Sequence, residues 1–322
     1  MLGILIAFLN RFGIDRGFQQ KIPGKNSGQN AFGSAVSSRM IKFWTAAVLA
    51  SIFVVLGALL EGQAGIETLQ SLTELTLKMA VVSSVAAAVT VTIMTVLRLP
   101  VSTSQAAVGA ILGIGFVNKQ VNIAGLGKVI ACWFGTPIGG LLIAIVLYRL
   151  LAVVYNRSRI DMFESDILLR LALIVAGSYA AYALGANNVA NVTAVFVGAG
   201  QLTVFAAALV GGLSIALGIL TFSRGVMETV GRKLVRLDPF SALVVVLSEA
   251  ITVHIYTVLG VPVSTSQAVI GAVLGVGIVK GINTVSRRTL TNIFIGWFFT
   301  PVVACFIAIT IYFVVHLRYI PG

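Results

Sequence analysis

The sequence predicts an all-α integral membrane protein, and three observations lead to that fold class. Of the 322 residues, 58% are hydrophobic and only 10% are charged, whereas a soluble domain carries about 25% charged residues. Seven stretches contain no Asp, Glu, Lys or Arg, and each is close to or longer than the roughly 20 residues that a helix needs to cross a bilayer. Their continuous apolar runs are typical of helices, since the strands of a membrane barrel alternate polar and apolar residues.

The uncharged stretches are Phe43–Leu60, Met79–Leu97, Leu99–Asn118, Val129–Tyr148, Leu171–Ser223, Ala250–Val279 and Thr289–Leu317. The fifth and sixth are long enough for more than one crossing or for a re-entrant hairpin. With Pro239–Ser248 added, we expect about ten membrane segments in a multi-pass protein of the cell membrane. The net charge of +12 is spread thinly over short loops, which favours anchoring at the cytoplasmic face of the lipid bilayer and not binding of nucleic acid.

Three sequence landmarks occur twice in the same order. "GKNSGQN" at Gly24–Asn30 corresponds to "GANNVAN" at Gly185–Asn191, and "CWFGTP" at Cys132–Pro137 to "GWFFTP" at Gly296–Pro301. Between them, "PVSTSQAAVGAILG" from Pro100 corresponds to "PVSTSQAVIGAVLG" from Pro262, with eleven of fourteen residues identical. The spacing of 161 to 164 residues stays nearly constant, so the chain contains two homologous halves.

The loop charges predict that the two halves lie in the membrane with inverted topology. The loop Glu61–Lys78 has a net charge of −2, whereas its equivalent Arg224–Pro239 has a net charge of +2. Because Lys and Arg accumulate on the cytoplasmic side, the first loop is predicted outside and the second inside. Chance drift of charge in one loop pair is the alternative. We expect a divergent N-terminal segment (1–23), a first transmembrane repeat (24–150), a cytoplasmic linker (151–170), a second transmembrane repeat (171–316) and a C-terminal tail (317–322).

The repeated PVSTSQ phrase has the residue types of an anion site at a helix start. Pro100 and Pro262 suit the first position of a helix, where a missing N–H costs nothing. The backbone N–H groups that follow have no acceptor within the helix and point toward a bound anion. In inverted halves the two copies would converge near the midplane and surround one anion. The candidate donors are Ser102, Thr103, Ser104, Gln105, Ser264, Thr265, Ser266 and Gln267; a pair of capped helix starts is the structural alternative.

Two further groups of residues are candidates. The density of Gly and Asn in "GANNVAN" disfavours a continuous helix and indicates a break or a hairpin tip. The Asn side chains offer oxygens to a small cation or amide donors to an anion; interhelical hydrogen bonding is the alternative. Glu249 and His254 are ionisable groups within a predicted segment; Glu249 is a candidate proton carrier or an interfacial residue, and His254 a packed residue.

We expect no catalytic residue and no metal site, because the chain has two histidines and lacks a nucleophile–base pair.

These residues give the sequence its resemblance to a known family. It resembles the inorganic phosphate transporter (PiT) family of cation-coupled permeases, whose signature is a duplicated G-A-N-D-x-x-N-A followed by P-V-S-T-[ST]-[HQ]-A. The resemblance implies inverted repeats with re-entrant hairpins, phosphate held by the Ser, Thr and Gln of the helix starts, and Na⁺ or H⁺ as the coupling ion without any other cofactor. Residues near the ion or substrate would be Asn26, Asn30, Asn187, Asn188 and Asn191, with Glu249 as a further candidate.

The departures from this family bear on coupling and substrate. Ser27 and Asn188 stand where the family usually has Asp, and Val54 and Ala216 where it has a Glu. Each lost carboxylate removes an anionic cation ligand, so weak Na⁺ coupling, H⁺ coupling or an uncoupled anion channel are open. The paired Asn resembles members that carry sulfate, although phosphate is favoured. Charged residues also interrupt the first apolar segment. A homodimer and a monomer both remain open.

Overall fold

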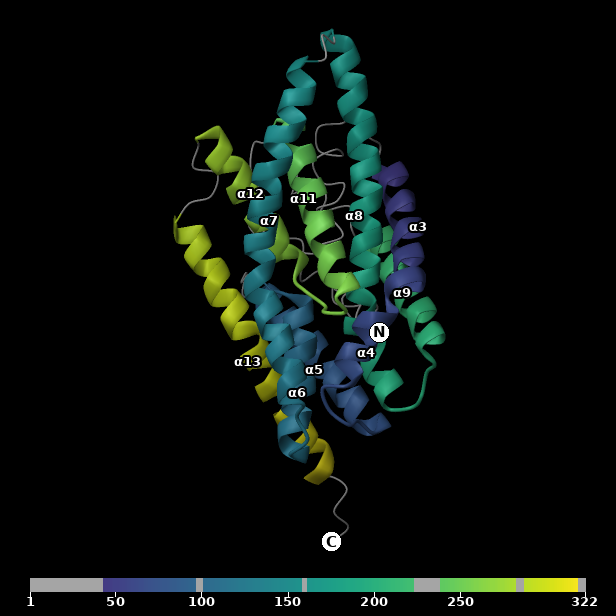
Figure 1. Ribbon diagram of the computed structural model, residues 1–322. Coiled ribbons are helices and arrows are strands. Elements are labelled where there is room, and N and C mark those ends of the chain that lie inside the picture. The colour runs from purple at the N-terminus through teal and green to yellow at the C-terminus, as the bar shows by residue number, and fades with distance from the viewer. Residues whose placement is uncertain (1–42, 97–100, 158–160, 223–237, 282–286, 318–322) are drawn as a thin grey trace.

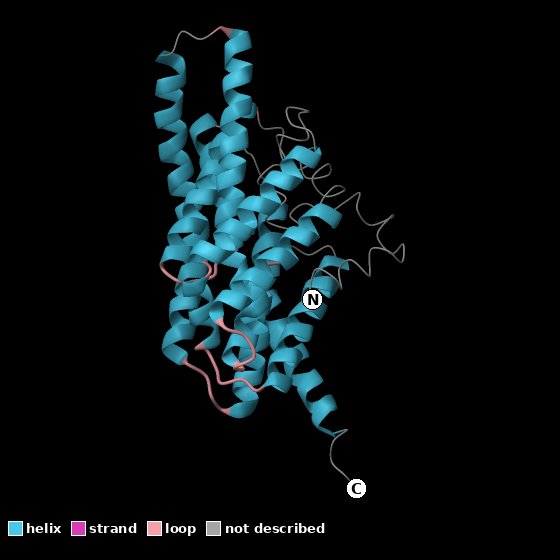
Figure 2. Cartoon of the chain, turned by 90° about the vertical axis from the view of Figure 1, so that its right-hand side faces the viewer, coloured by secondary structure: helices cyan, strands magenta, loops and turns pink. Residues whose placement is uncertain are grey.

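Every regular element in the described part of the chain is an α-helix. A computed structural model describes residues 43–96, 101–157, 161–222, 238–281 and 287–317 (Figures 1 and 2). Its helices are α3 (Phe43–Glu61), α4 (Gln63–Gln70), α5 (Leu77–Val96), α6 (Thr103–Asn118), α7 (Ile123–Arg157), α8 (Met162–Gly198), α9 (Val204–Phe222), α11 (Pro239–Val258), α12 (Thr265–Lys280) and α13 (Arg287–Leu317). The expected all-helical membrane fold is confirmed.

Seven of these helices are long and apolar enough to cross a membrane, namely α3, α5, α7, α8, α9, α11 and α13. Two apolar helices, α6 and α12, have 16 residues each and are about 24 Å long, which is shorter than a hydrocarbon core of about 30 Å. The described residues thus contain seven candidate membrane spans and two shorter apolar helices, which is nine segments where about ten were expected. The count is lower because Glu249 separates Pro239–Ser248 from the uncharged stretch that begins at Ala250, whereas the structure has one helix, α11, across both.

The longest helices, α7 and α8, project beyond the rest of the bundle at one end (Figures 1 and 2), and α11 packs against both of them. The expected linker 151–170 is helical over 151–157 and 162–170, where it continues α7 and begins α8. Arg149, Arg157 and Arg170 are exposed there. Asp161, Glu164 and Asp166 are exposed in the same segment. Charged side chains lie outside the hydrocarbon core, so this projection carries charged groups of both signs beyond the apolar part of the bundle.

The two short helices pack crosswise between the halves of the chain. Helix α6 of the first half lies against α13 of the second, and α12 of the second half lies against α7 of the first. Gly109 faces the backbone of Pro301, and Gly271 faces the backbone of Pro137 at the equivalent position. Small residues allow helix backbones to approach this closely in a membrane protein. Each half therefore supplies the helix that covers the short helix of the other half.

The "GANNVAN" segment lies within one continuous helix, so the predicted break or hairpin tip is wrong. Helix α8 runs through Gly185–Asn191 without interruption. Gly185 lies against the backbone of Val54 on α3, and Gly57 on α3 lies against the carbonyl of Tyr182 on α8. The glycine thus serves close packing between α3 and α8, and the Asn side chains use tertiary partners instead of breaking their own helix.

Replacing Gly271 by Ala should destabilise the fold because the new methyl group would overlap the backbone of Pro137. Overpacking of this kind costs about 1–3 kcal/mol, so the thermal unfolding temperature in detergent should fall by several degrees. Gly218→Ala is the matched control, since no atom lies within 4 Å of a Cβ at that helical position. An unchanged melting temperature for Gly271→Ala would contradict the close contact.

Candidate functional site

Each PVSTSQ segment leads into a short helix, α6 or α12, and places a serine directly before its first residue. Ser102 is the residue before α6, and its hydroxyl accepts a hydrogen bond from the Gln105 amide. Ser264 occupies the same position before α12. The prediction that proline is the first helical residue is wrong for the second copy, because Pro262 precedes the start of α12 by three residues; Pro100 lies outside the described residues. Proline disfavours helical backbone in the residue before it, here Val261, and the non-helical stretch Val261–Ser264 leads into α12.

The backbone of Val263 joins the two halves of the chain. Its carbonyl oxygen accepts hydrogen bonds from Ser104 Oγ at 2.9 Å and from Asn187 Nδ2 at 2.8 Å, and its N–H donates to Asn187 Oδ1 at 2.9 Å. Asn187 and Ser104 are almost fully buried. Because Ser104 lies in the first turn of α6 and Val263 directly precedes Ser264, these bonds place the two helix starts beside each other.

Asn188 and Asn191 extend this contact toward α6. The Asn191 amide nitrogen donates to Ser104 Oγ at 2.9 Å and to Asn188 Oδ1 at 2.8 Å. Thr103 Oγ1 donates to the same Asn188 oxygen at 3.4 Å. Three elements, α6, α8 and the stretch before α12, therefore meet through polar side chains from both repeated motifs. The structure brings together all the predicted site residues that it describes from the PVSTSQ and GANNVAN segments.

Hydrogen-bond donors at this junction come mainly from the backbone. The amides of Thr103, Ser104, Thr265 and Ser266 lie in the first turns of α6 and α12, where a helix offers its N–H groups no internal acceptor. The Ser104 hydroxyl is already used on Val263, whereas Ser264 and Ser266 pair with each other at 2.8 Å. Thr103, Ser266, Asn188 and Asn191 are partly exposed, so the junction is reachable at these residues.

Three buried oxygen atoms at the junction have no hydrogen-bond partner. They are Gln105 Oε1, Gln267 Oε1 and Asn191 Oδ1, and both glutamines are about 97% buried. A buried polar atom without a partner costs about 1–3 kcal/mol, so such atoms point to a group that is absent from the protein itself. Since these are acceptors, a cation or a protonated ligand oxygen would satisfy them. The sequence predicted these glutamines only as donors.

Comparison with known proteins bears on what this junction does. The model of a family described as the phosphate transporter family matches residues 23–308. The chain belongs to this phosphate transporter family. A relative from Methanocaldococcus jannaschii named "Putative phosphate permease" is 30% identical over 290 residues, covering 90% of this chain and 92% of the relative. The sulfate permease CysP of Bacillus subtilis is 29% identical and covers 86% and 80%.

A solved structure described as the sodium-dependent phosphate transporter has the same fold. It aligns with a TM-score of 0.78 at 25% identity and covers 98% of both chains. The chain is therefore a multi-pass membrane protein of a transporter family, and phosphate transport is the activity to which this family membership points. The resemblance given by the repeated motifs is confirmed.

The acidic groups differ from the family pattern in the part of the chain that the structure describes. Val54 on α3 and Ala216 on α9 are buried apolar residues, and no group of three or more metal-binding side chains occurs among the described residues. Glu249 is buried in α11 at 4% exposure, and its Oε2 atom has no hydrogen-bond partner. Asn26, Ser27 and Asn30 lie outside the described residues. Glu249 does not occupy any of the positions at which the family pattern has a carboxylate.

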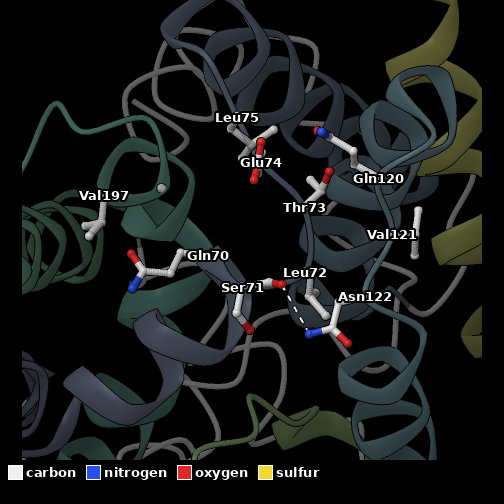
Figure 3. A pocket seen from close by; sticks show the side chains of 11 residues that line it. Gln70, Ser71, Leu72, Thr73, Glu74, Leu75, Gln120, Val121, Asn122 and Val197 are labelled. Atoms are coloured by element: carbon white, nitrogen blue, oxygen red, sulfur yellow. Dashed lines mark hydrogen bonds between the residues drawn. The ribbon is translucent and has the colours of Figure 1, made fainter.

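A polar cavity opens at the end of the bundle where α6 ends. It has a volume of about 700 Å³ and lies between the α4–α5 and α6–α7 connections and the end of α8 (Figure 3). Glu74, Thr73 and Gln120 line it together with apolar residues. It contains none of the predicted site residues, and α6 separates it from the helix starts by about 24 Å. No sequence motif predicted this cavity, because its lining comes from two connections and a helix end that share no pattern.

Replacing Asn187 by Ala should separate the stretch before α12 from α8. The buried N–H of Val263 would lose its acceptor and its carbonyl would lose one of two donors, at a cost of about 1–3 kcal/mol for each unsatisfied group. We expect a clear fall in melting temperature in detergent. Ser214→Ala is the control, since this exposed serine bonds only within its own helix. Equal stability of the two variants would refute the role of Asn187.

Proposed function

We propose that this chain is a secondary transporter that moves inorganic phosphate across the membrane, with the anion bound between the starts of α6 and α12. The observation that carries the proposal is the Ser104–Val263 hydrogen bond, because it joins the starts of the two helices that follow the PVSTSQ copies, in a member of the phosphate transporter family. Two helix starts at one point combine their free amides and the positive ends of their dipoles.

A neutral site of this type suits transport. Backbone amides and hydroxyl groups bind an oxyanion by hydrogen bonds without the strong attraction of a buried Lys or Arg, so the anion can leave again. Thr103 and Ser266, which are partly exposed, are the side chains best placed to contact it directly. Ser104 acts differently, because its proton is bonded to Val263; it holds the two helix starts in register.

The two repeats are proposed to have inverted topology, with α5–α6 and α11–α12 as re-entrant hairpins that enter from opposite faces. Figure 1 supports this arrangement, since α6 lies in the lower part of the bundle and α12 in the upper part. Their first turns are joined through Val263, so the two short helices leave the junction toward opposite ends. Repeats of this kind allow alternating access around a fixed site.

Coupling to Na⁺ or H⁺ is proposed from the unpaired acceptors. An anion alone offers no donors to Gln105 Oε1, Gln267 Oε1 and Asn191 Oδ1, whereas a Na⁺ ion takes oxygen ligands and a proton on phosphate supplies a donor. Family likeness to a protein described as a sodium-dependent phosphate transporter supports Na⁺. Symport of a cation with the anion would satisfy both the donors and the acceptors of the junction.

Sulfate is the second candidate substrate, and an uncoupled anion channel is a second candidate mode. The likeness to a sulfate permease and the paired Asn187–Asn188 favour sulfate. However, sulfate carries no proton at neutral pH, so it would leave the acceptors unpaired unless a cation accompanies it. Flux without any dependence on a Na⁺ or pH gradient would favour the channel.

Purified protein in proteoliposomes should take up radiolabelled phosphate in preference to sulfate, driven by an imposed Na⁺ or pH gradient. Ser104→Ala and Ser266→Ala should each lower uptake about tenfold, because loss of one buried hydrogen bond is worth about 1–1.5 kcal/mol. Ser214→Ala should retain the wild-type rate. Unchanged uptake in both motif variants would refute the site, and preferred uptake of sulfate would replace the proposed substrate.

A further inference from the structure

An acidic, an imidazole and a phenolic side chain lie in polar contact away from the two helix starts, through one ion-pair contact and one hydrogen bond. His254 Nε2 lies 2.7 Å from Glu61 Oε2, and His254 Nδ1 lies 2.7 Å from the Tyr179 hydroxyl. The rings of Tyr179 and Tyr182 also pack against the imidazole, with centroid distances of 5.5 and 5.9 Å. This cluster fixes both nitrogen atoms of His254 between defined partners.

The cluster connects the two halves of the chain. Glu61 is the last residue of α3 in the first half, His254 lies on α11, and Tyr179 lies on α8. The residue of the first half equivalent to His254, 162 positions earlier, is Thr92, which bonds only to the Ala88 carbonyl of its own helix. The duplicated framework therefore does not require a histidine at this position, and His254 has no ionisable counterpart in the first half.

The His254 side chain is 25% exposed and the Glu61 side chain 34% exposed. A cavity of about 370 Å³ adjoins the cluster and is lined by Glu61, Glu67 and Thr257, among others. A proton can therefore reach the imidazole from solvent, whereas a fully buried pair would be closed to it. Histidine is also the side chain that changes charge nearest neutral pH.

The hydrogen bonds allow His254 to gain a proton without moving. In the neutral form, Nε2–H donates to the Glu61 carboxylate and Nδ1 accepts from the Tyr179 hydroxyl. When a proton binds to Nδ1, that nitrogen donates to the Tyr179 oxygen instead, and the tyrosine O–H turns away. The charge of the Glu61–His254 pair then changes from −1 to zero. Tyr179 is a positioning residue in this exchange, since it accepts or donates as the imidazole requires.

We propose that His254, with Glu61 as its counter-ion, is a proton-binding site through which transport responds to pH on the face of the membrane that carries Glu61, Glu67 and Glu74. This inference rests on the proposed transport function. Protonation removes the net charge of the pair, so helices can close around it with a smaller loss of hydration free energy. The proton would thereby favour a closed arrangement of α3 against α11.

The position of the cluster links it to the junction between the starts of α6 and α12. His254 lies on α11 ten residues before Ser264, and Tyr179 lies on α8 two turns before Asn187. These two helices carry the Asn187 and Val263 groups that join the helix starts. A change in the packing of α3 against α8 and α11 therefore acts on the helices that hold the site.

Other charged groups around His254 lie farther out or are already bonded. Among the described residues, Glu67 on α4 accepts a hydrogen bond from Gln63, and Lys128 on α7 donates to the Leu259 carbonyl at the end of α11. Tyr182 on α8 interacts with Glu61, and Glu249 on α11 is five residues from His254, which places it on a different face of the helix. Glu61 is thus the carboxylate that responds directly to the charge of His254.

The test compares the two histidines of the chain. His254→Gln removes the proposed site, and His316→Gln is the matched control, because His316 stacks on Tyr312 near the end of α13. Phosphate uptake into proteoliposomes is measured from about pH 5 to pH 8 on the outside, with the inner pH and the Na⁺ concentration fixed. The control variant corrects for the protonation of phosphate itself, since the substrate is the same in both.

We expect the KM for phosphate of wild type and His316→Gln to rise with pH by up to about tenfold per pH unit more than that of His254→Gln, the limit for one linked proton. In micelles without substrate, the imidazole ¹⁵N signal of His254 should change between about pH 5 and pH 8, as the proposed proton site requires. A pH profile of His254→Gln identical to that of His316→Gln, or an imidazole signal that does not titrate, would overturn the proposal.

Failure of the proposed function would look different. If wild-type vesicles take up neither phosphate nor sulfate, both histidine variants are equally inactive, and the transport function fails together with the role of His254 in it. If wild type transports phosphate but the two histidine variants have the same pH profile, only the proton site fails. Loss of folding is checked by the melting temperature of each variant, and Tyr179→Phe provides a milder change that keeps the ring packing.

Discussion

The backbone of Val263 imposes the main constraint on this structure. Between α11 and α12 the chain leaves helical geometry inside an otherwise apolar bundle, and its N–H and C=O groups have no water to bind. Asn187 satisfies the N–H and one lone pair of the carbonyl, and Ser104 satisfies the other. These two side chains come from α8 and α6. The hydrogen bonds that Val263 requires therefore fix the positions of α6, α8 and the stretch before α12 relative to one another.

This constraint explains why the polar PVSTSQ and GANNVAN motifs occur within otherwise apolar segments. Asn is suited to the position because its side-chain amide offers the same donor and acceptor as a peptide group, and Asn187 pairs with Val263 as a neighbouring strand would. Ser104 is small enough to lie in the first turn of α6 while reaching across to the other half. Once these bonds are made, the side-chain oxygens of Gln105 and Gln267 still have no hydrogen-bond partner within the protein, and the proposed site assigns its ligands to these atoms and to the remaining amides of both helix starts.

The sequence predicted the duplication, the helical segments and the approach of the two PVSTSQ copies, because these depend on hydropathy and on identical residues at a constant spacing. It did not predict that "GANNVAN" remains helical. Propensity disfavours Gly and Asn in a helix, but Gly185 allows α3 to approach and Asn187 finds its partner 76 residues away. The prediction that Pro262 is the first residue of its helix was wrong for a similar reason. The chain at Val263 is not helical, and its backbone pairs with Asn187 instead. Contacts between distant segments decided both outcomes, and no local pattern contains them.

The two halves share a framework but not their ionisable groups. Gly109 and Gly271 make equivalent backbone contacts with Pro301 and Pro137, so the packing needed for the fold is kept in both. In contrast, Glu249 and His254 correspond to Ala87 and Thr92, and the Asp238–Lys280 ion pair corresponds to Thr76 and Asn118. The contacts that hold the helix backbones together therefore repeat between the halves, because the fold depends on them in both places. The ionisable groups of α11 and α12 have no counterpart at the equivalent positions of the first half, so their chemistry does not follow from the duplication.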